Sequence, residues 1–511
     1  GDKRADILMK AADLYEEHAG EFFAVLCREA GKTPKDAVAE LREAVDFLRY
    51  YATQVPDSNV QGPGVITTCI SPWNFPLAIF TGQIAAALSA GNGVLAKPAD
   101  STPLVAHVAI GLLHKAGVPR PVLQLLPGSG ASIGAKLVSA PQIGGVCFTG
   151  STATAQRINT SMASSLHPAA PLIAETGGLN AMIVDSTALP EQAVKDIIVS
   201  SFQSAGQRCS ALRLLYLQED IATEFLEMLF GAMDELTVGD PWHFKTDLGP
   251  VITGDAQTDI ANYVEVAKKD GRLLKQISAP HQGTFVPPSI IKVDGIGDLS
   301  REVFGPVLHV ATFGSHEIRK IVSDINASEY GLTFGLHTRI DDRVEYVTSA
   351  LNVGNIYVNR NQIGAIVGSQ PFGGEGLSGT GPKAGGPNYV KRFSPLLTLG
   401  HRTADQLHAD PEHVQAALDQ ISRPSREALS ETELPGPTGE SNRLSVFGRG
   451  TVLCLGPTVE VARAQAEIAA QCGCKFLMVA AGCEGVHAIS DHLERGQLTS
   501  LAGIDVVALW S

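Results

Sequence analysis

The chain has 511 residues, of which 44% are hydrophobic and 18% are charged. This balance is ordinary for a globular protein and excludes a largely disordered chain, while the length predicts about three domains. Lys and Arg number 39 against 53 Asp and Glu, and the formal net charge of −14 gives the chain no general attraction for nucleic acid or anionic lipid.

The first part of the chain predicts two helices followed by a parallel sheet. Apolar side chains at helical spacing open the chain near 7–15, and a second helical stretch, 35–53, follows a turn at 31–34. Four predicted strands then alternate with four predicted helices: strands 65–70, 94–97, 122–126 and 145–149, and helices 77–90, 103–116, 131–139 and 152–165. The first three strand centres, near 67, 95 and 124, are 28 and 29 residues apart, the length of a βαβ unit. Such alternation favours a sheet covered on both faces.

A second α/β region follows, and a third, smaller one ends the chain. The second has predicted strands at 181–184, 213–217, 307–313 and 353–358, a helix at 219–235, and a Gly-rich stretch at 364–387. From 403 to 446 the pattern weakens, and prolines among many Ser, Thr and Glu predict a linker or arm. From 450 the strand-like TVLCLG and KFLMVAA enclose a helix near 458–471, which predicts a small βαβ module.

The eight cysteines predict neither a disulfide framework nor a metal site. They are sparse for a chain of 511 residues, and Cys472 and Cys474 have only Cys483 and His487 nearby as further ligands. No secretory signal is visible, and no apolar run reaches the roughly 18 residues of a membrane span. Because the chain begins with Gly inside a predicted helix and stops just after a strand-like VVALW, we expect a piece of a longer protein with a truncated last module.

Three short strings bring reactive groups to predicted strand or helix ends. Cys209, in SAGQRCS, is a candidate nucleophile, although taken alone a buried inert cysteine is the commoner case. Glu175, in AETGG, follows an apolar run, where a carboxylate suits a general base; the alternative is a solvated loop residue. Asn74, in SPWNFP, is a candidate oxyanion donor or a turn residue between two prolines.

Two glycine-containing turns and a lysine suggest a site for phosphate or ribose. PGSGASIG, 127–134, has the spacing G-x-G-x-x-x-G and lacks the acidic residue that follows a dinucleotide fingerprint about 20 positions later. In FTGST, Ser151 begins a predicted helix, whose N-terminus suits a phosphate. Lys97 ends a predicted strand and is a donor for a ribose hydroxyl or phosphate, or simply an exposed lysine.

Taken together and in this order, the strings resemble the aldehyde dehydrogenase superfamily over about positions 1–400. They are SPWNFP, AKPAD, FTGST, ETGG, GQRC, EVFGP (302–306) and PFGGEGLSG (371–379). The longer string NRNQIGAIVGSQPFGGEGLSGTGPKAGGPNY, 359–389, resembles the branch that oxidises L-glutamate gamma-semialdehyde, formed from pyrroline-5-carboxylate. LPGPTGESNRL, 434–444, followed by a small α/β module, resembles the C-terminal half of the bifunctional proline-utilisation enzymes, in which a proline dehydrogenase barrel precedes this part.

The resemblance implies an α/β aldehyde dehydrogenase fold: a Rossmann-like parallel-sheet cofactor domain and an α/β catalytic domain, with a small C-terminal α/β module. The implied divisions are an NAD-binding domain at 1–176 without its first strands, a catalytic domain at 177–375, a closing segment, oligomerisation arm and linker at 376–446, and a Rossmann-like module at 447–511.

The family's chemistry carries over to three residues here. Cys209 would attack the aldehyde, and the oxyanion formed would lie between the Asn74 side chain and the Cys209 backbone N–H. After hydride passes to a nicotinamide, Glu175 would activate the water that hydrolyses the thioester.

The resemblance also implies the binding residues. For NAD they are Ile70, Ser71, Trp73, Lys97, Asp100, Gly130, Gly134, Ser151, Glu302 and Phe304. Asp100 departs from the Glu usual in this family and is one methylene shorter. For the substrate they are a carboxylate anchor at Ser210, Gly364 and Ala365, with Phe75 and Phe372 on either side of the aliphatic chain. No metal is implied, and FAD is expected only in the proline dehydrogenase domain.

We therefore expect NAD-dependent oxidation of glutamate semialdehyde, the second step of proline catabolism, in a cytoplasmic homo-oligomer. The alternatives are another semialdehyde dehydrogenase, such as one for succinate semialdehyde, or a non-catalytic scaffold of the same fold. The intact Cys209, Glu175 and Asn74 argue against the scaffold for the main unit.

Overall fold

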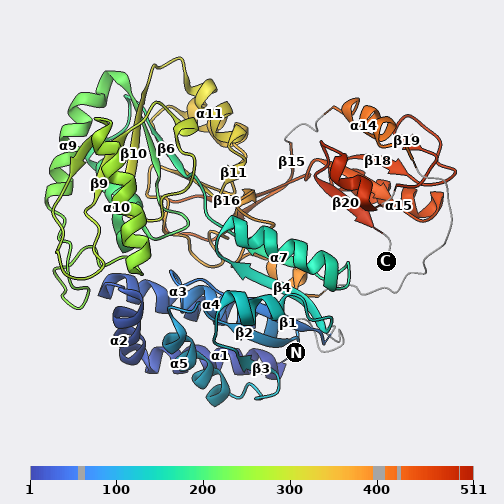
Figure 1. Ribbon diagram of the computed structural model, residues 1–511, viewed down its shortest axis with the longest axis horizontal. Coiled ribbons are helices and arrows are strands. Elements are labelled where there is room, and N and C mark those ends of the chain that lie inside the picture. The colour runs from blue at the N-terminus through green and yellow to red at the C-terminus, as the bar shows by residue number, and fades with distance from the viewer. Residues whose placement is uncertain (1, 56–63, 395–408, 423–426, 494, 510–511) are drawn as a thin grey trace. The chain divides into compact units, whose positions relative to one another are not determined.

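The computed structural model describes residues 2–55, 64–394, 409–422, 427–493 and 495–509. The chain divides into two compact units, Gly1–Pro395 and Leu396–Ser511. The first unit contains a five-stranded and a seven-stranded sheet, and the second contains a hairpin and a four-stranded sheet (Figure 1).

The five-stranded sheet is entirely parallel, with the order β3-β2-β1-β4-β5. Its strands are β1 (Ile66–Ile70), β2 (Gly93–Lys97), β3 (Leu123–Leu125), β4 (Ile143–Thr149) and β5 (Leu172–Glu175). The chain runs outward from β1 to β3 and then returns to add β4 and β5 on the other side of β1. This reversal between β1 and β4 opens a crevice at the carboxyl ends of the strands, where open α/β sheets bind their ligands.

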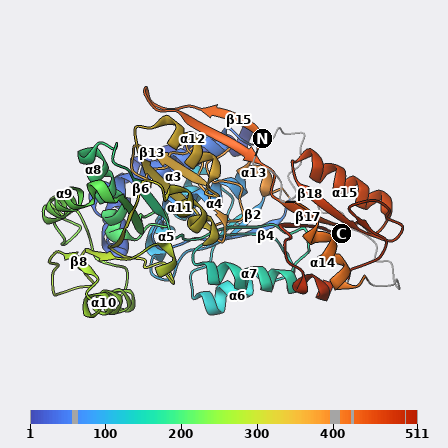
Figure 2. The same cartoon turned by 90° about the horizontal axis from the view of Figure 1, so that it is seen from above.

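Helices cover both faces of this sheet. One face is covered by α4 (Ala78–Ser89) and α5 (Pro103–Ala116), with α1 (Asp2–Glu17), α2 (Ala19–Ala30) and α3 (Pro34–Ala52) packed outside them. The other face is covered by α6 (Ala135–Leu137) and α7 (Thr152–Ser165), and Figure 2 shows α4 and α7 on opposite sides of the strands. Helix α4 is buried almost all round because its side chains are small and apolar. A Cβ at Gly82 would lie 2.9 Å from the Phe47 ring, so this glycine lets α3 approach α4.

The seven-stranded sheet has the order β13-β12-β6-β7-β10-β9-β8, and only β8 runs antiparallel to its neighbour among these strands. Its strands are β6 (Ala181–Val184), β7 (Leu214–Gln218), β8 (Leu273–Gln276), β9 (Ser289–Lys292), β10 (Val307–Phe313), β12 (Thr333–His337) and β13 (Asn355–Val358). Its helices are α8 (Pro190–Phe202) and α9 (Ala222–Asp234) on one face, α11 (Ile318–Ala327) and α12 (Asp341–Ala350) on the other, and α10 (Gly254–Lys269) beside β8 and β9. Two short strands, β11 (Tyr330–Gly331) and β14 (Glu375–Gly376), pair separately, and α13 (Tyr389–Arg392) follows.

The second unit has its own small core. A four-stranded parallel sheet has the order β19-β18-β17-β20, and an antiparallel hairpin precedes it in the chain. The elements are α14 (Pro411–Asp419), β15 (Ala428–Leu434), β16 (Asn442–Phe447), β17 (Thr451–Leu455), α15 (Val459–Gln471), β18 (Lys475–Val479), β19 (Ala488–Ile489) and β20 (Val506–Leu509). Leu453, Leu477 and Val479 pack against α14 on one face of the sheet.

The predicted fold class is confirmed, and most predicted elements lie within two residues of the observed ones. Two local predictions differ in detail from the structure. The stretch 131–139 is a π-helical turn, Gly130–Gly134, followed by the short α6. Residues 403–446 are more than a linker, because they contain α14 and most of the hairpin; 403–408 and 423–426 lie outside the described residues. Strand β15 is exposed along almost its whole length, so hydrophobic alternation could not reveal it. The domain limits at 176, 375 and 446 stay predictions.

Candidate active site

A strained turn presents Cys209 between α8 and β7. Ser204, Ala205 and Gly206 all have left-handed backbone conformations, with φ of 59°, 53° and 67°, which is costly for residues other than glycine. A Cβ at Gly206 would lie 2.1 Å from the carbonyl oxygen of Gly305, so this position accepts only glycine. The segment 204–210, hereafter the nucleophile loop, leaves Cys209 only partly buried.

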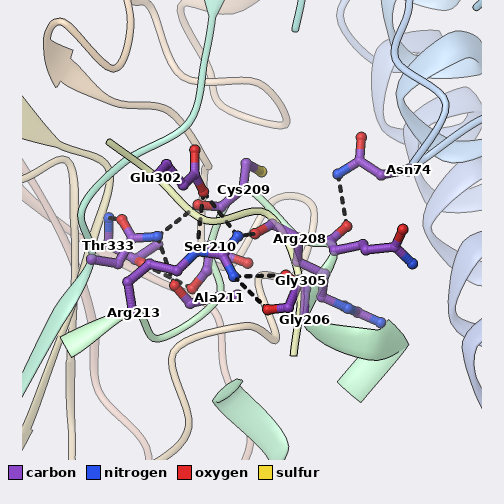
Figure 3. Close-up of polar contacts among 12 residues, drawn as sticks. Asn74, Gly206, Arg208, Cys209, Ser210, Ala211, Arg213, Glu302, Gly305 and Thr333 are labelled. Atoms are coloured by element: carbon purple, nitrogen blue, oxygen red, sulfur yellow. Dashed lines mark hydrogen bonds and ion pairs between the residues drawn. The ribbon is translucent and has the colours of Figure 1, made fainter. Parts of the chain in front are cut away.

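Two buried side chains hold the carbonyl groups of the nucleophile loop (Figure 3). Asn180 Nδ2 donates to the carbonyls of Cys209 at 2.6 Å and Ala211 at 2.9 Å. Arg213, with 1% of its surface exposed, donates to the carbonyls of Gly206 at 2.7 Å and Arg208 at 3.0 Å. With these carbonyls turned toward Asn180 and Arg213, the Cys209 amide is left without a hydrogen-bond acceptor among the described residues.

The thiol is neutral at pH 7 in this state. Burial, together with the nearby carboxylates of Glu302, Glu175 and Glu43, raises the pKa of Cys209 to about 12. The Ser210 amide opposes this by donating to the sulfur. Because the thiolate is the nucleophile, the thiol must lose its proton, and bound cationic groups would favour that loss.

The Asn74 side chain lies against the nucleophile loop. Its Nδ2 donates to the Gln207 carbonyl at 3.1 Å, which uses one of its two hydrogens. Lys32 Nζ donates to the Asn74 backbone carbonyl at 2.5 Å and to Ser204 Oγ at 3.2 Å, so both residues are tied to one cation. An oxyanion formed at Cys209 would have the second Asn74 hydrogen and the free Cys209 amide as donors, the arrangement of an oxyanion hole.

Glu175 ends β5 in a cradle of glycines. Its Oε2 accepts from the Gly374 amide at 2.9 Å, and its buried Oε1 has no hydrogen-bond partner among the residues that the structure describes. A Cβ at Gly373 or Gly379 would lie within 2.9 Å of the carboxylate. Burial raises the pKa of Glu175 to about 8, with Gly374 and Lys383 acting in the opposite sense. A carboxyl that titrates near neutral pH is suited to accept a proton from water.

The predicted cofactor residues of β1 and β2 lie at the crevice of the five-stranded sheet. Ile70 is paired with Lys97 on one side and Phe148 on the other, and the Ser71 amide donates to the Lys97 carbonyl at 3.1 Å. Ser71 Oγ is buried and has no hydrogen-bond partner in the described part of the chain. Buried Lys97 Nζ donates to Asp100 Oδ1 at 3.0 Å, so Asp100 positions Lys97. An unpartnered hydroxyl and a lysine at a topological switch point suit a dinucleotide.

The predicted phosphate region is open. Ser151 is the N-cap of α7 and its Oγ accepts from the Thr154 amide at 3.3 Å, with no acidic residue in the first turn of the helix. Gly130 and Gly134 bound the π-helical turn, and a Cβ at Gly134 would meet Lys97 Cε at 3.7 Å. Gly134 therefore lies beside the Lys97 side chain, whereas no contact joins Gly130 to these residues among those described.

Glu302 and Phe304 approach this edge from the seven-stranded sheet. Phe304 makes an edge contact with Trp73, with ring centroids 5.6 Å apart. Glu302 pairs with Arg213 at 2.9 Å and is 20% exposed, and burial raises its pKa while Arg213 opposes the rise. A Cβ at Gly177 would lie 1.8 Å from Glu302 Oε2, so this glycine admits the carboxylate.

The predicted carboxylate anchor is joined to the nucleophile loop by Gln362. Gln362 Nε2 donates to the Ser210 carbonyl at 3.4 Å and to Thr333 Oγ1 at 3.2 Å. Two and three residues further on, the amides of Gly364 and Ala365 donate to no described group. Two free amides in one partly exposed loop can receive an anion.

The two predicted aromatic residues have different surroundings. Phe75 lies close to two cations, with Lys32 Nζ 4.9 Å and the Arg208 guanidinium carbon 5.3 Å from its ring centroid. Phe372 is placed by a backbone bridge with Ala384. No ring contact joins Phe75 to Phe372 among the described residues, and their place on either side of the substrate stays a prediction.

The sequence did not reveal a buried charged cluster in which three carboxylates of α3 meet two cations from outside that helix: Asp36, Glu40, Glu43, Lys32 and Arg208. Asp36 pairs with Arg208 at 3.0 Å and Glu40 with Lys32 at 3.3 Å. Glu43 is half-buried, and burial raises its pKa to about 8, as does Glu40 beside it. The available signal was spacing: Asp36, Glu40 and Glu43 share one helix face with apolar residues.

The fold is that of the aldehyde dehydrogenase class of proteins. The family model described as "Aldehyde dehydrogenase family" matches residues 1–398, and the chain belongs to this family. "Bifunctional protein PutA" (proline utilisation A) of Klebsiella aerogenes is 49% identical over 514 residues, covering 93% of this chain and 39% of that protein. This chain therefore spans about two fifths of such relatives.

Shorter relatives match over most of their own length. "1-pyrroline-5-carboxylate dehydrogenase" of Geobacillus sp. (strain WCH70) is 39% identical, over 76% of this chain and 79% of that protein. The crystal structure of the Thermus 1-pyrroline-5-carboxylate dehydrogenase with bound NAD is 35% identical, with a TM-score of 0.71 over 77% of this chain and 80% of that one. The similarity to such enzymes is therefore not confined to the bifunctional proteins.

Proposed function

We propose that this chain oxidises L-glutamate gamma-semialdehyde to L-glutamate with NAD as the hydride acceptor, the second step of proline catabolism. One observation supports the proposal most: the loop of the half-buried Cys209 is bonded to Asn74 through the Gln207 carbonyl and to Gln362, which precedes the free amides of Gly364 and Ala365, through the Ser210 carbonyl. The names of relatives that share this region, PutA and 1-pyrroline-5-carboxylate dehydrogenase, support the same substrate.

The crevice of the five-stranded sheet supports NAD as the cofactor. The unpartnered Ser71 hydroxyl, the buried Lys97 and the uncharged first turn of α7 fit a dinucleotide at the switch point between β1 and β4. Glu302 would hold the nicotinamide ribose, with Trp73 and Phe304 beside the ring. NAD, when bound there, supplies the carbon that accepts hydride.

The chain's own groups then perform the remaining steps. Once the thiol has lost its proton, the Cys209 sulfur bonds to the aldehyde carbon, and Asn74 with the Cys209 amide stabilises the oxyanion. Loss of hydride leaves a thioester on Cys209. Glu175 takes a proton from water as the water oxygen bonds to the thioester carbon, and the carbon–sulfur bond breaks to release glutamate.

Glu43 supports an amino-acid semialdehyde over succinate semialdehyde. Both substrates carry a carboxylate for the anchor, and only glutamate semialdehyde carries an ammonium group. Glu43 lies one turn after Glu40 on α3, and Glu40 Oε2 accepts from the Ala78 amide at 2.9 Å, so this part of α3 lies against the segment that follows Asn74. A carboxylate there can pair with an ammonium group. We therefore assign the ammonium of the substrate to Glu43.

The decisive experiment is a comparison of three aldehydes by the absorbance of reduced cofactor. Glutamate semialdehyde should be preferred over succinate semialdehyde, and both over a neutral aliphatic aldehyde. Glu43→Gln should raise the KM for glutamate semialdehyde and leave that for succinate semialdehyde unchanged. Asp46→Asn, one turn along α3 and solvent-exposed, is the matched control. A preference for succinate semialdehyde would replace the proposed substrate, and no turnover at all would favour the scaffold.

The anchor has a separate test. Ala365→Leu should crowd the anion site, and losing one charge-assisted hydrogen bond, worth about 1.5–3 kcal/mol, should raise the KM for glutamate semialdehyde by roughly tenfold or more. A neutral aldehyde has no carboxylate, so its kinetics should change little. Equal impairment of both substrates would make the loop merely structural.

The names of the relatives support proposals about the full-length protein. The PutA proteins are bifunctional by name, which supports a proline dehydrogenase domain with FAD in the full-length protein. Among the described residues, no helix is both long and apolar enough to cross a bilayer. We place the enzyme in the cytoplasm as a homo-oligomer, with the arm 376–446 at its interface; light scattering of the full-length protein tests the oligomer.

A further inference from the structure

One guanidinium group, that of Arg213, joins the two loops that meet at the active site. Arg213 NH1 donates to the carbonyls of Gly206 at 2.7 Å and Gly305 at 3.4 Å, and NH2 donates to the Arg208 carbonyl at 3.0 Å. Nε and NH2 both donate to Glu302 Oε1, at 3.2 and 2.9 Å. Gly206 and Arg208 belong to the nucleophile loop, and Glu302 and Gly305 belong to the loop before β10 (Figure 3).

The Arg213 side chain is itself rigidly placed. It directly precedes β7 with 1% of its surface exposed, and its guanidinium carbon lies 5.2 Å from the Phe304 ring centroid. Its backbone carbonyl accepts from the His309 amide at 2.9 Å and lies 2.8 Å from His309 Nδ1, whose ring also bonds Tyr263 at 2.8 Å. Burial lowers the pKa of His309 to about 4, so the ring is neutral and its Nδ1 hydrogen can donate to that carbonyl.

The hydrogen bonds of Arg213 help to hold the nucleophile loop in a backbone conformation that is energetically costly. Three consecutive left-handed residues, 204–206, persist only where their surroundings hold them. Arg213 binds the carbonyl of Gly206, the last residue of this turn. The next two residues, Gln207 and Arg208, lead directly to Cys209. A shift of the guanidinium therefore reaches the position of the thiol and of the Cys209 amide.

The same guanidinium fixes Glu302, the carboxylate assigned to the nicotinamide ribose. Both bonds go to Oε1, while Oε2 lies against Gly177 and the carboxyl is one fifth exposed. One oxygen thus belongs to Arg213, and the carboxyl retains accessible surface for a ribose hydroxyl. A ligand that moves the Glu302 carboxylate therefore also moves the Arg213 guanidinium.

We infer that Arg213 is a positioning residue that couples the cofactor site to the nucleophile, so that cofactor binding at Glu302 changes the reactivity of Cys209 through the Arg213 guanidinium. This inference rests on the proposed use of NAD. Lysine cannot replace Arg213, because an ammonium group is a point charge and cannot bond two loops in the fixed fork of a guanidinium.

The test uses Arg213→Lys and Arg213→Met in the intact protein. The readouts are the Kd of NAD and the rate at which iodoacetamide alkylates Cys209, without NAD and at saturating NAD. In the wild type, NAD should change the alkylation rate several-fold. In both variants the Kd should rise about tenfold, the loss of about 1.4 kcal/mol, and the ratio of alkylation rates with and without NAD should fall to about one.

The control is Arg343→Met. Arg343 pairs with buried Asp185 at the far end of β6, so its loss also leaves a carboxylate unpaired but touches neither loop. It should lower the melting temperature and leave the alkylation ratio unchanged. If Arg343→Met abolishes the ratio as well, the effect reports general destabilisation, and the inference is overturned.

Two further outcomes decide the matter. A folded Arg213→Lys with wild-type Kd and alkylation ratio would reduce Arg213 to a structural role. If neither Arg213 variant folds, Glu302→Gln replaces them, and the ratio at saturating NAD must again fall to about one or the coupling is refuted. Because these readouts need no aldehyde, a failure of glutamate semialdehyde as substrate would be seen separately from a failure of the coupling.

Discussion

The first four strands of the five-stranded sheet and the four strands of the second unit have the same topology. In the first unit the order is β3-β2-β1-β4, and in the second it is β19-β18-β17-β20, so in both the first strand lies between the second and the fourth. Both first strands have five residues, as do both second strands. Each sheet therefore has a switch point of the kind that binds ligands.

The two switch points differ in the groups that line them. The second strand ends in Lys97 in the first unit and in buried, apolar Val479 in the other. The helix after the first strand is α4 in the first unit and α15 in the second. The first turn of α4 contains no acidic residue, whereas the first turn of α15 contains Glu460. A carboxylate at a helix N-terminus stabilises the helix and repels the phosphate that would otherwise bind. Topology thus offers a place for a cofactor, and the polar groups at the strand ends decide whether it is used.

The largest effect on turnover is expected from a comparison of Cys209 in the first unit with Cys454 in the second. Cys209→Ala should reduce turnover by roughly 10⁴-fold or more and leave the Kd of NAD within about twofold, because the thiol forms the covalent intermediate and contacts the cofactor little. Cys454→Ala, which removes a buried thiol from β17, should lower stability alone. Steady-state rates and thermal melting of both variants check this. Turnover of Cys209→Ala above a few per cent would refute the assignment.

The next largest effect is expected when the substitutions of Glu175 and Glu460 are compared. Glu175→Gln should slow deacylation by about 10²–10⁴-fold and reveal a burst of reduced cofactor, since the base acts after hydride transfer. In the wild type, deacylation should rise as the pH rises through about 8, where Glu175 loses its proton. Glu460→Gln should show neither change. A missing burst with impaired aldehyde addition would assign Glu175 to an earlier step.

The same carboxyl gives a stability prediction. Its pKa is about 8 when folded and near the ordinary 4.5 when unfolded, so the folded state holds the proton more tightly between these values. Its contribution to stability is present below about pH 4.5 and is lost as the pH rises toward 8. Relative to Glu175→Gln, the wild type should lose up to about 1.4 kcal/mol per pH unit in this window. Urea unfolding at pH 5 and pH 7 measures the difference, and a constant gap would contradict the raised pKa.

A smaller effect is expected for the oxyanion donor. Asn74→Ala should lower kcat by about 10²–10³-fold with little change in NAD binding. Asn442→Ala removes another buried asparagine, which bonds the Pro435 carbonyl in the second unit, and should leave kcat unaltered. If Asn74→Ala instead raises KM alone, its amide binds the ground state and not the oxyanion.

The smallest effect compares two lysines on the second strands. Lys97→Met should raise the Kd of NAD by about fivefold, roughly 1 kcal/mol for one polar contact. Lys475→Met, at the exposed start of β18, should leave it within about twofold. Titration by fluorescence quenching measures both. An equal effect of the two would mean that the second unit also takes part in cofactor binding.

The sequence allowed most strands of the parallel sheets to be predicted, because such sheets repeat a strong local pattern along the chain. It located Cys209, Glu175 and Asn74 but not the groups that hold them. Arg213 lies four residues after Cys209, and nothing local distinguishes an arginine that bonds three carbonyls from one on the surface. Lys32 meets Asn74 and Ser204 across 42 and 172 residues, a contact that only the folded chain creates. The hairpin β15–β16 was missed because exposed strands lack alternation.

The edge contact between Trp73 and Phe304 gives the protein an internal optical reporter. The chain has three tryptophans; Trp242 is 53% exposed, and Trp510 lies outside the described residues. Trp73 is partly buried against Phe304, next to the place proposed for the nicotinamide, so its emission should be bluer than that of Trp242 and should be quenched when reduced cofactor forms there. Trp73→Phe would erase that signal, and each turnover in the unaltered protein could then be followed by light emitted from the active site itself.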